Sequence, residues 1–473
     1  MPPFLRRPLA ALALSACPLL AAPLSAPLAA QAAPAGAAAA TQPLTPAVAR
    51  AVADTIADQF VRAYVDADTG KLIAARLRAR SRAGAYDQVT NPLQFAGLLT
   101  KDLRAINGDK HLAVWYMPDD ELAIQLGPEG IRMRDTTPEP PPTAAELAMN
   151  RRRHFGVARL DVLPGNVGYA RITGFPGNDA ETRAMFTTVL RYLEPTDAII
   201  FDFREMHGGS GELSNFLLSH FTGPDSVLSL RIRNRSAAET IDRWTLADVP
   251  GPRRPDVPLF ILTGPGTVSA GEDFTFVLHN LHRATLVGET TAGAGHNNEV
   301  VRSGHGFVTS ISFTRVMDPA TGAEWERVGI RPDIAAPLAR ALDVAQLAAL
   351  DTLGARAAQA RNARGQRELG LIREVVAAQA APRALAAATL KRYTGVYGDR
   401  VVTAGEGGLR VHRGDFPAED LVALGGDTFA LAAAPLNRLV FTRDARGTAA
   451  LRIVRPNGES QTVARTGPAP TRR

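Results

Sequence analysis

A serine stands where the sequence predicts a corner between a strand and a helix. Ser269 belongs to the run Leu262-Thr-Gly-Pro-Gly-Thr-Val-Ser-Ala-Gly-Glu272, after an apolar stretch over 258–263 and before an amphipathic one over 270–283. At such a corner a hydroxyl can project from a tight turn while the first helical N–H groups stay free to bind an anion. That geometry suits a serine nucleophile. The alternative is that Ser269 only caps the helix, with Glu272 completing a Ser-x-x-Glu capping box.

A serine nucleophile needs further groups. Acyl transfer requires a base, a group that orients the base, and N–H donors where negative charge develops on the carbonyl oxygen. The run Asp202-Phe-Arg-Glu-Met-His-Gly-Gly-Ser210 ends a predicted strand in two glycines, which let the backbone approach a ligand closely. Gly208 or Gly209, together with the N–H of Ala270, could supply the donors. An ordinary flexible turn is the alternative for the two glycines.

Four motifs follow one another along the chain. They are Asn166-Val-Gly-Tyr169, Asp202-Phe-Arg with Gly208-Gly-Ser210, Thr267-Val-Ser-Ala-Gly-Glu272 with Gly288-Glu-Thr-Thr-x-Gly293, and Val328-Gly-Ile-x-Pro-Asp333. In this order they resemble the serine peptidases that include C-terminal processing (tail-specific) proteases, the tricorn core peptidase and interphotoreceptor retinoid-binding protein. The resemblance covers roughly residues 45–345. It implies an α/β fold with a crotonase/ClpP-like core, a superhelix of ββα units, preceded by a helical bundle.

The resemblance offers two kinds of base. Tail-specific members carry a lysine after Thr-x-Gly, but Ala294 occupies that position here, and no lysine lies between Ser269 and Lys391. The chain instead resembles the branch that has Gly-x-Gly-His in place of the lysine motif and takes a histidine from far upstream. That branch implies His111 as the base and Glu326 as the carboxylate that orients it. An imidazole with a pKa of about 6.5 can accept and return a proton near neutrality.

Neighbouring residues compete for these roles. His296 follows the serine more closely in sequence and is the alternative base. Glu324 is expected on the same strand face as Glu326. Tricorn-like members also place a bridging hydroxyl residue directly before the histidine, where this chain has Lys110, so Asp109 could orient the imidazole instead. The sequence leaves open which of the three carboxylates does so.

Composition predicts neither a metal nor a nucleic-acid partner. The nine histidines form no His-x-x-x-His or His-Glu-x-x-His pair, and His279 and His282 come nearest, three residues apart. The net charge of +6 is mild for 473 residues, and no basic block is interleaved with aromatic residues. No cofactor is expected, and the resemblance implies a peptide or protein substrate.

The N-terminal residues predict export. Residues 1–32 combine Arg6 and Arg7, an apolar stretch and small residues before a cleavage point, which is typical of a bacterial signal peptide. The expected location is therefore the periplasm or the medium. Cys17, the only cysteine, lies in Leu14-Ser-Ala-Cys17, which resembles a lipoprotein acylation box, so a membrane-anchored lipoprotein is the alternative. No later stretch approaches the ~20 apolar residues that span a bilayer.

The rest of the chain divides into several predicted parts. Residues 33–44 are expected to be a disordered spacer, and 45–107 a helical domain because apolar residues recur at three- and four-residue steps. Strands alternate with helices in the catalytic core over 108–345, a helical connector spans 346–384, and short strands over 385–473 predict a β-barrel or sandwich. About fifty residues separate Trp115 from Val167, too few for a PDZ domain. The oligomeric state is not determined by the sequence.

Overall fold

The structure is a computed structural model that describes residues 43–469 except 120–122, 128–129, 132–140, 236–239, 406–407 and 444–448. The predicted signal peptide, Cys17 and nearly all of the predicted spacer lie outside the described residues. Among the residues that are described, no helix is both long and apolar enough to cross a bilayer.

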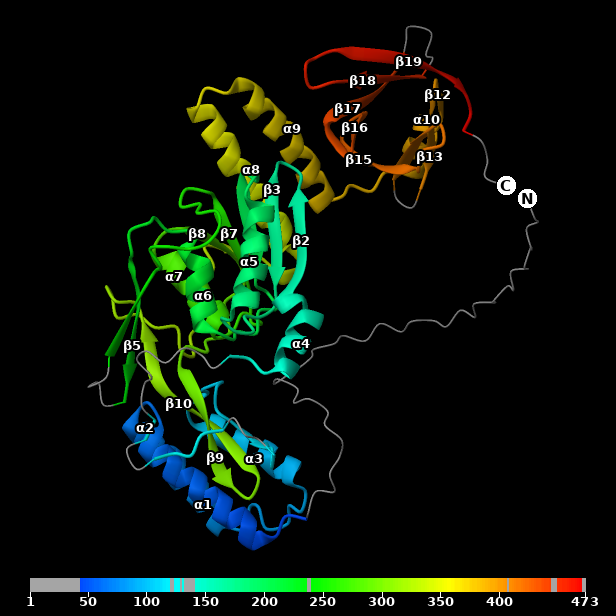
Figure 1. Cartoon of the computed structure of the whole chain (residues 1–473). Helices are drawn as coiled ribbons and strands as arrows, with labels where there is room; N and C mark the ends of the chain where they lie inside the picture. Colours follow the sequence, from blue (N-terminus) through cyan, green and yellow to red (C-terminus); the bar gives the residue numbers. More distant parts are fainter. Residues whose placement is uncertain are drawn as a thin grey trace, which may run out of the picture. The chain divides into compact units, whose positions relative to one another are not determined.

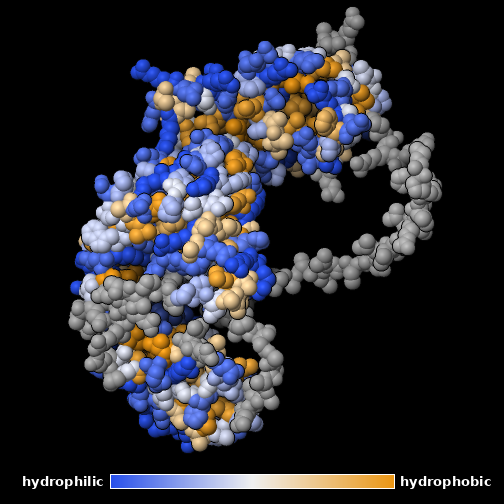
Figure 2. Space-filling view, in the orientation of Figure 1, coloured by the Kyte–Doolittle hydropathy of each residue, from blue (hydrophilic) through white to orange (hydrophobic). Residues whose placement is uncertain are grey.

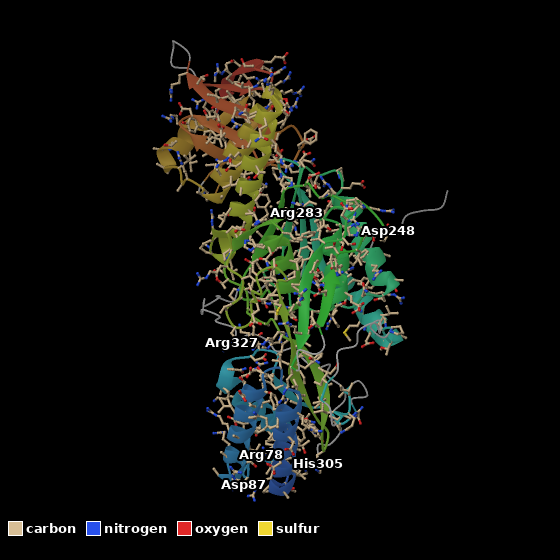
Figure 3. All side chains as sticks on the ribbon, turned by 90° about the vertical axis from the view of Figure 1, so that its left-hand side faces the viewer. Arg78, Asp87, Asp248, Arg283, His305 and Arg327 are labelled. Carbon is tan, nitrogen blue, oxygen red and sulfur yellow. The ribbon has the colours of Figure 1, made fainter. Side chains whose placement is uncertain are left out.

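Three capped helices open the described chain. They are α1 (Pro46–Ala63), α2 (Ala67–Arg82) and α3 (Pro92–Asn107), and the side chains of Thr45, Asp66 and Asn91 accept hydrogen bonds from their first backbone N–H groups. The left-handed Gly108 ends α3 and turns the chain toward β1 (Ala113–Tyr116). The apolar faces of these helices pack on β1 and on two strands from much later in the chain, β9 (Asn297–Gly304) and β10 (Phe307–Met317). Figure 3 shows Arg78, Asp87 and His305 of the β9–β10 turn at the same end of the molecule, with the N-terminal helices.

An antiparallel sheet packs against these helices and extends toward the α/β part of the chain. Its strand order is β1-β10-β5-β6, with β9 also paired to β10. The long β10 pairs with β1 and β9 along its first part and with β5 (Leu228–Asn234) along its last part. The strand β6 (Thr240–Trp244) forms the edge. Figure 1 shows β10 running from the helical part toward β5.

A six-stranded sheet forms the centre of the α/β part. Its order is β11-β8-β7-β4-β3-β2, made of β2 (Val157–Leu163), β3 (Val167–Ile172), β4 (Ala198–Asp202), β7 (Leu259–Thr263), β8 (Ala284–Gly288) and β11 (Ile334–Ala335). All neighbours are parallel except the edge pair β2–β3. The strands β4 and β7 are buried along their whole length, as expected for parallel strands covered on both faces.

Helices cover both faces of this sheet. Ile199 and Phe201 of β4 join a core with α5 (Ala180–Leu193), α6 (Gly211–Ser219) and α7 (Ala270–Asn280). Ala198 and Ile200 face α8 (Ala341–Gln359) and α9 (Ala363–Ala380). This alternation follows the two-residue period of a strand. A short helix, α4 (Ala144–Arg152), and the 3-10 turns η1 (His154–Gly156) and η2 (Leu338–Arg340) complete the connections.

The C-terminal part is a closed barrel. After α10 (Ala387–Tyr393), the strands run in sequence order as β12 (Gly395–Tyr397), β13 (Arg400–Ala404), β14 (Leu409–Arg413), β15 (Glu419–Gly425), β16 (Thr428–Leu431), β17 (Ala434–Arg443), β18 (Ala449–Val454) and β19 (Ser460–Gly467). The barrel has its own hydrophobic core. Arg438 of β17 bonds to the carbonyl of Leu371 and the carboxylate of Glu374 on α9, both at 2.8 Å. Figure 2 shows hydrophobic residues gathered on the visible face of this part.

The predicted fold class is confirmed as an α/β protein with N-terminal helices, and the barrel alternative holds for the C-terminal strands. One predicted boundary is wrong. The helix after Ser269 ends at Asn280 instead of Arg283, because His282 has a left-handed φ of 52° that cannot continue a helix.

Candidate active site

Ser269 occupies a strained turn between β7 and α7. Its φ of 51° and ψ of −118° lie outside the regions that a serine normally adopts, at a cost of about 1–3 kcal/mol that the surroundings must offset. The preceding Val268 N–H donates to Met206 at 2.9 Å, and the Thr267 hydroxyl donates to the Phe203 carbonyl at 2.8 Å. Both acceptors belong to the segment that follows β4, so the turn is held against the loop that carries the glycine pair.

Glu272 fixes the same turn from the other side. Its fully buried carboxylate accepts the Ser269 N–H at 3.0 Å, the Thr291 hydroxyl at 2.6 Å, and the N–H groups of Gly293 and Ala294 at 2.6 and 2.8 Å. Burial raises the pKa of Glu272 against the opposing effect of these donors. The sequence indicated this glutamate only as a helix cap. The Ser-x-x-Glu spacing indicated the bond between Glu272 and the Ser269 N–H. No local pattern indicated that Glu272 also binds the loop at Gly293 and Ala294.

His111 reaches the serine from a distant segment. Its Nε2 lies 3.3 Å from Ser269 Oγ, across 158 positions of sequence. The histidine lies between α3 and β1, where Arg104 bonds to the carbonyls on either side, Leu112 at 2.6 Å and Lys110 at 2.8 Å. The structure therefore brings the predicted nucleophile and the predicted base within contact of each other.

The protonation of His111 is set by its surroundings. Burial lowers its pKa below the ordinary 6.5, the negative charge of Asp109 opposes this, and His296 and Arg104 lower it further. The imidazole is therefore neutral at pH 7 and can accept a proton. Its buried Nδ1 has no hydrogen-bond partner among the described residues.

Gly208 of the glycine pair approaches the serine closely. Gly208 and Gly209 have φ values of 88° and 123°, and a Cβ built on Gly208 would lie 2.9 Å from Ser269 Cβ and 3.3 Å from Ala270 N. The Gly208 carbonyl accepts the Phe175 N–H at 2.8 Å, which joins the glycine pair to the segment after β3. Within the described residues, the N–H groups of Gly208, Gly209 and Ala270 have no acceptor. These donors are available beside Ser269.

Asp109 is the carboxylate nearest to the base. It is fully buried and accepts three hydrogen bonds, from the Tyr64 hydroxyl at 2.9 Å, the backbone N–H of His111 at 2.9 Å and Nδ1 of His296 at 3.2 Å. Burial alone would raise the pKa of Asp109, but the bond and charge of His296 and the charge of His111 lower it to about 2. Asp109 is thus an anion beside the imidazole, although it bonds to the backbone of His111 and not to the ring.

Glu326 does not contact His111, unlike the expected arrangement. Its Oε2 accepts the N–H groups of Gly295 at 2.7 Å and His296 at 3.2 Å, and Oε1 has no partner among the described residues. Glu326 instead lies against the loop that bears His296, where a Cβ on Gly295 would come within 2.9 Å of Glu326 N. Glu324 lies farther away, 3.4 Å from Arg315.

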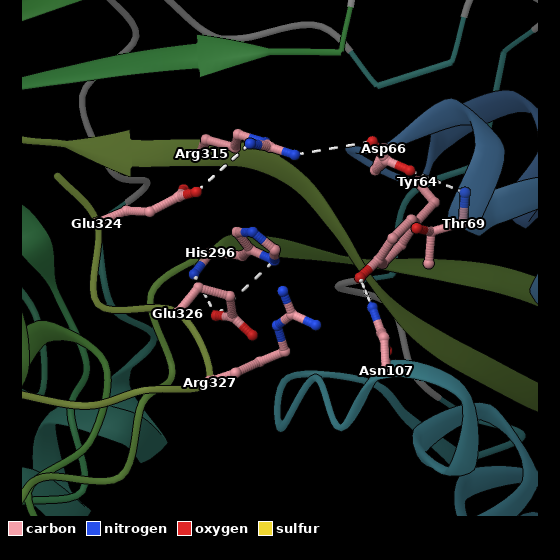
Figure 4. A pocket seen from close by; sticks show the side chains of 9 residues that line it. All are labelled: Tyr64, Asp66, Thr69, Asn107, His296, Arg315, Glu324, Glu326 and Arg327. Atoms are coloured by element: carbon pink, nitrogen blue, oxygen red, sulfur yellow. Dashed lines mark hydrogen bonds and ion pairs between the residues drawn. The ribbon is translucent and has the colours of Figure 1, made fainter. Parts of the chain in front are cut away.

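Among the described residues, no hydrogen bond joins His296, the alternative base, to Ser269. Its Nδ1 is directed at Asp109, and its ring borders a polar cavity of about 260 Å³ shown in Figure 4. The cavity is lined by Tyr64, Asp66, Thr69, Asn107, His296, Arg315, Glu324, Glu326 and Arg327.

One group of side chains could hold a metal ion. Asp109, His296 and Glu326 offer ligand atoms within 4.8 Å of one another, and no other such group occurs in the described part of the chain. Imidazole and carboxylates are ligands that zinc accepts. Direct hydrogen bonds already join these residues, so we assign no ion to them.

Curated proteins with similar sequences are peptidases by name. The chain is 27% identical over 223 residues to carboxyl-terminal-processing peptidase 2, chloroplastic, of Arabidopsis thaliana, which covers 45% of this chain and 39% of the relative. It is 28% identical over 176 residues to a carboxyl-terminal-processing protease of Synechocystis sp., covering 37% and 39% respectively. The match thus spans about two fifths of the length of these relatives.

Solved structures show partial likeness. A lipoprotein from Streptococcus agalactiae is 15% identical with a TM-score of 0.43, covering 65% of this chain and 96% of that one. A peptidase structure from Parabacteroides merdae is 17% identical with a TM-score of 0.40, covering 64% and 93%.

Two protein-family models match the N-terminal helices and the α/β part of the chain. The N-terminal domain of Peptidase_S41 in eukaryotic IRBP matches residues 35–157, and peptidase family S41 matches residues 166–336. The second match contains Ser269, the glycine pair and the loops of His296 and Glu326, and the first contains His111. Together the two models span more than half of the chain, which therefore belongs to peptidase family S41.

Proposed function

We propose that this protein is a serine peptidase that hydrolyses peptide bonds through an acyl-enzyme, with Ser269 as the nucleophile and His111 as the base. The observation that carries the proposal is the 3.3 Å contact between His111 Nε2 and Ser269 Oγ. A neutral imidazole at that distance is within reach of the hydroxyl proton. The histidine-based branch of the family fits this arrangement, since Ala294 stands where other members carry the lysine.

The reaction follows from these positions. Ser269 Oγ forms a bond to the carbonyl carbon of the substrate while its proton passes to His111 Nε2. The carbonyl oxygen becomes an anion, and the N–H groups of Ala270 and of Gly208 or Gly209 donate to it. The C–N bond then breaks, and His111 returns the proton to the leaving amine. Water, activated by the same imidazole, attacks the ester and frees Ser269.

Asp109 takes the place expected of the orienting carboxylate. When His111 accepts the proton it becomes a cation, and the adjacent Asp109 anion stabilises that charge. Its bond to the His111 N–H also fixes the segment that carries the ring. Glu326 acts one step farther away, through His296.

We also propose a protein or peptide substrate outside the cytoplasm. The names of the two relatives describe processing at a carboxyl terminus, and the export signal predicted over 1–32 supports a periplasmic, secreted or lipid-anchored location. We further propose that substrate capture does not use a PDZ domain. In the described part of the segment between β1 and β2, the helical elements are the short α4 and η1.

Activity-based labelling tests the proposal. A fluorophosphonate probe is expected to label the full mature chain at Ser269, as located by mass mapping, and Ser269→Ala is expected to lose both labelling and peptide cleavage. Ser460→Ala, at an exposed serine of β19, is the matched control and should be labelled like the wild type. Continued peptide cleavage by Ser269→Ala would reject the mechanism. A wild type that is neither labelled nor active on a peptide library would indicate a ligand-binding protein of the same fold.

A further inference from the structure

His296 lies between two buried carboxylates. Its Nδ1 is 3.2 Å from Asp109 Oδ2 and 3.8 Å from Glu326 Oε2, and its backbone N–H donates to that same Glu326 oxygen at 3.2 Å. The three residues are 9%, 0% and 8% exposed respectively. The imidazole is therefore flanked by carboxyl groups on two sides and has little contact with solvent.

Two neighbouring carboxylates in a buried site need a compensating cation or donors. Several titratable and charged groups face His296 from the elements around it. They are Tyr64 and Asp66 between α1 and α2, Asp109 and His111 before β1, Arg315 on β10, and Glu324, Glu326 and Arg327 from the loop after β10. Arg315 is already paired, 3.4 Å from Glu324 and 3.7 Å from Asp66. His296 is the basic side chain that contacts both Asp109 and Glu326.

The charge of His296 agrees with this geometry. Burial lowers its pKa, but the hydrogen bond to Asp109 and the charges of Glu326 and Asp109 outweigh burial and raise it. Figure 4 shows the His296 ring beside the Glu326 carboxylate at the wall of the polar cavity.

We propose that His296 is a positioning residue that holds Asp109 in place behind His111 and carries a positive charge shared between Asp109 and Glu326. The inference rests on the proposed function of Ser269 and His111. The connection runs from His296 Nδ1 to Asp109 Oδ2, and from Asp109 Oδ1 to the backbone N–H of His111 at 2.9 Å. Tyr64 donates to Asp109 as well, at 2.9 Å, so His296 supplies one of its two side-chain donors.

Two substitutions separate the hydrogen bond from the charge. His296→Ala removes both, whereas His296→Asn keeps an N–H donor near the position of Nδ1 and removes only the charge. We expect kcat of His296→Ala to fall about 100-fold with KM nearly unchanged, since a small displacement of a catalytic group costs that much. His296→Asn should recover most of the loss. The His296 charge lowers the pKa of His111, so the acidic limb of the pH profile of His296→Asn should move to higher pH.

The control is His279→Asn, at a histidine of α7 that bonds to Asp333 at 2.9 Å, which should keep wild-type kcat, KM and pH profile. Melting temperatures of all variants show whether each is folded. If His296→Ala does not fold, the pH limb of His296→Asn decides the question alone.

Several results would overturn the inference. Wild-type kcat and KM in His296→Ala would do so, and so would an unshifted acidic limb in the pH profile of His296→Asn. Loss of activity in both variants while His111→Ala stays active would make His296 the base. One equivalent of divalent metal in the purified protein, lost in His296→Ala, would also overturn it. If the fluorophosphonate probe labels the wild type and the His296 variants keep wild-type kinetics, only this inference is refuted. If the probe does not label the wild type, the proposed function is refuted.

Discussion

Individual residues around Ser269 have two separate tasks. In the proposed mechanism, one set provides the reacting groups, namely the hydroxyl, the imidazole of His111 and the N–H donors that have no acceptor among the described residues. The other set holds those groups in conformations that are unfavourable by themselves. Glu272 belongs to the second set, because its carboxylate joins the strained serine turn to Gly293 and Ala294.

We predict that Glu272→Gln lowers the free energy of unfolding by about 2–4 kcal/mol, because an amide NH2 would face the N–H groups that the carboxylate now accepts. Fluorophosphonate labelling of Ser269 should slow at least about tenfold in the folded variant, as the turn loses its support. Denaturant titration and labelling rates measure the two effects. The exposed Glu212→Gln in α6 is the control, and equal behaviour of the two variants would contradict the assignment.

The pH dependence of peptide cleavage should reflect the environment of His111. The base acts when neutral, and burial lowers its pKa below 6.5, so activity should persist below pH 6.5 and fall only at lower pH. The profile of kcat/KM with an uncharged substrate measures this limb. If kcat/KM instead begins to fall above pH 6.5 as the pH is lowered, His111 is not the titrating base or its ring is more solvated than the structure indicates.

At the scale of elements, the base and the nucleophile depend on different supports. Ser269 lies at the end of a parallel strand in the central sheet, whereas His111 follows α3 and precedes β1. The strand β10 pairs with β1 along one part and with β5 along another, which holds the segment after α3 in one antiparallel sheet. We expect the packing of α3 on this sheet to affect the distance between His111 and Ser269.

Phe95→Ala on α3 should test this support. Phe95 is fully buried and its ring lies 5.4 Å from those of Tyr86 and Phe307, so its removal should cost about 3–5 kcal/mol. Labelling of Ser269 should also slow in the folded variant, because α3 leads to His111. Leu93→Ala on the same helix, 61% exposed, is the control and should change neither quantity. Unchanged labelling in a destabilised Phe95→Ala would show that α3 does not position the base.

At the scale of the whole molecule, the barrel is built around a core of its own. Its buried side chains, including Tyr393, Phe429 and Phe441, form a cluster distinct from those of the sheet and helices. Stability of the barrel and reactivity of Ser269 should therefore vary independently.

Phe441→Ala provides that test. Phe441 is 5% exposed and stacks on Tyr393 with ring centroids 4.5 Å apart, so the substitution should destabilise the barrel by about 3–5 kcal/mol. The labelling rate of Ser269 should stay at the wild-type value below the melting transition. Phe416→Ala, 74% exposed, is the control for stability. A slower labelling rate in Phe441→Ala would link the barrel to the site.

Short-range pattern was enough to predict several parts of the site. The strand, the turn and the first helical turn around Ser269 depend on neighbours in sequence, and so do the paired glycines after β4, since hydrophobic periodicity and turn residues act locally. The resemblance then indicated His111. The local pattern could not show that Glu272 also binds the loop at Gly293, because that contact joins two loops across 21 positions.

Tertiary structure decided which carboxylate faces the base. Asp109, His296 and Glu326 come from three segments, and their order in space depends on how the loop through Gly295 packs against Glu326. Sequence established that the chain carries a serine at a strand-to-helix corner, a distant histidine and several candidate acids. Asp109 already stands two positions before His111 in the sequence, but only the folded chain brought His296 and Glu326 to it, because burial and hydrogen bonding between remote segments act after the local elements have formed.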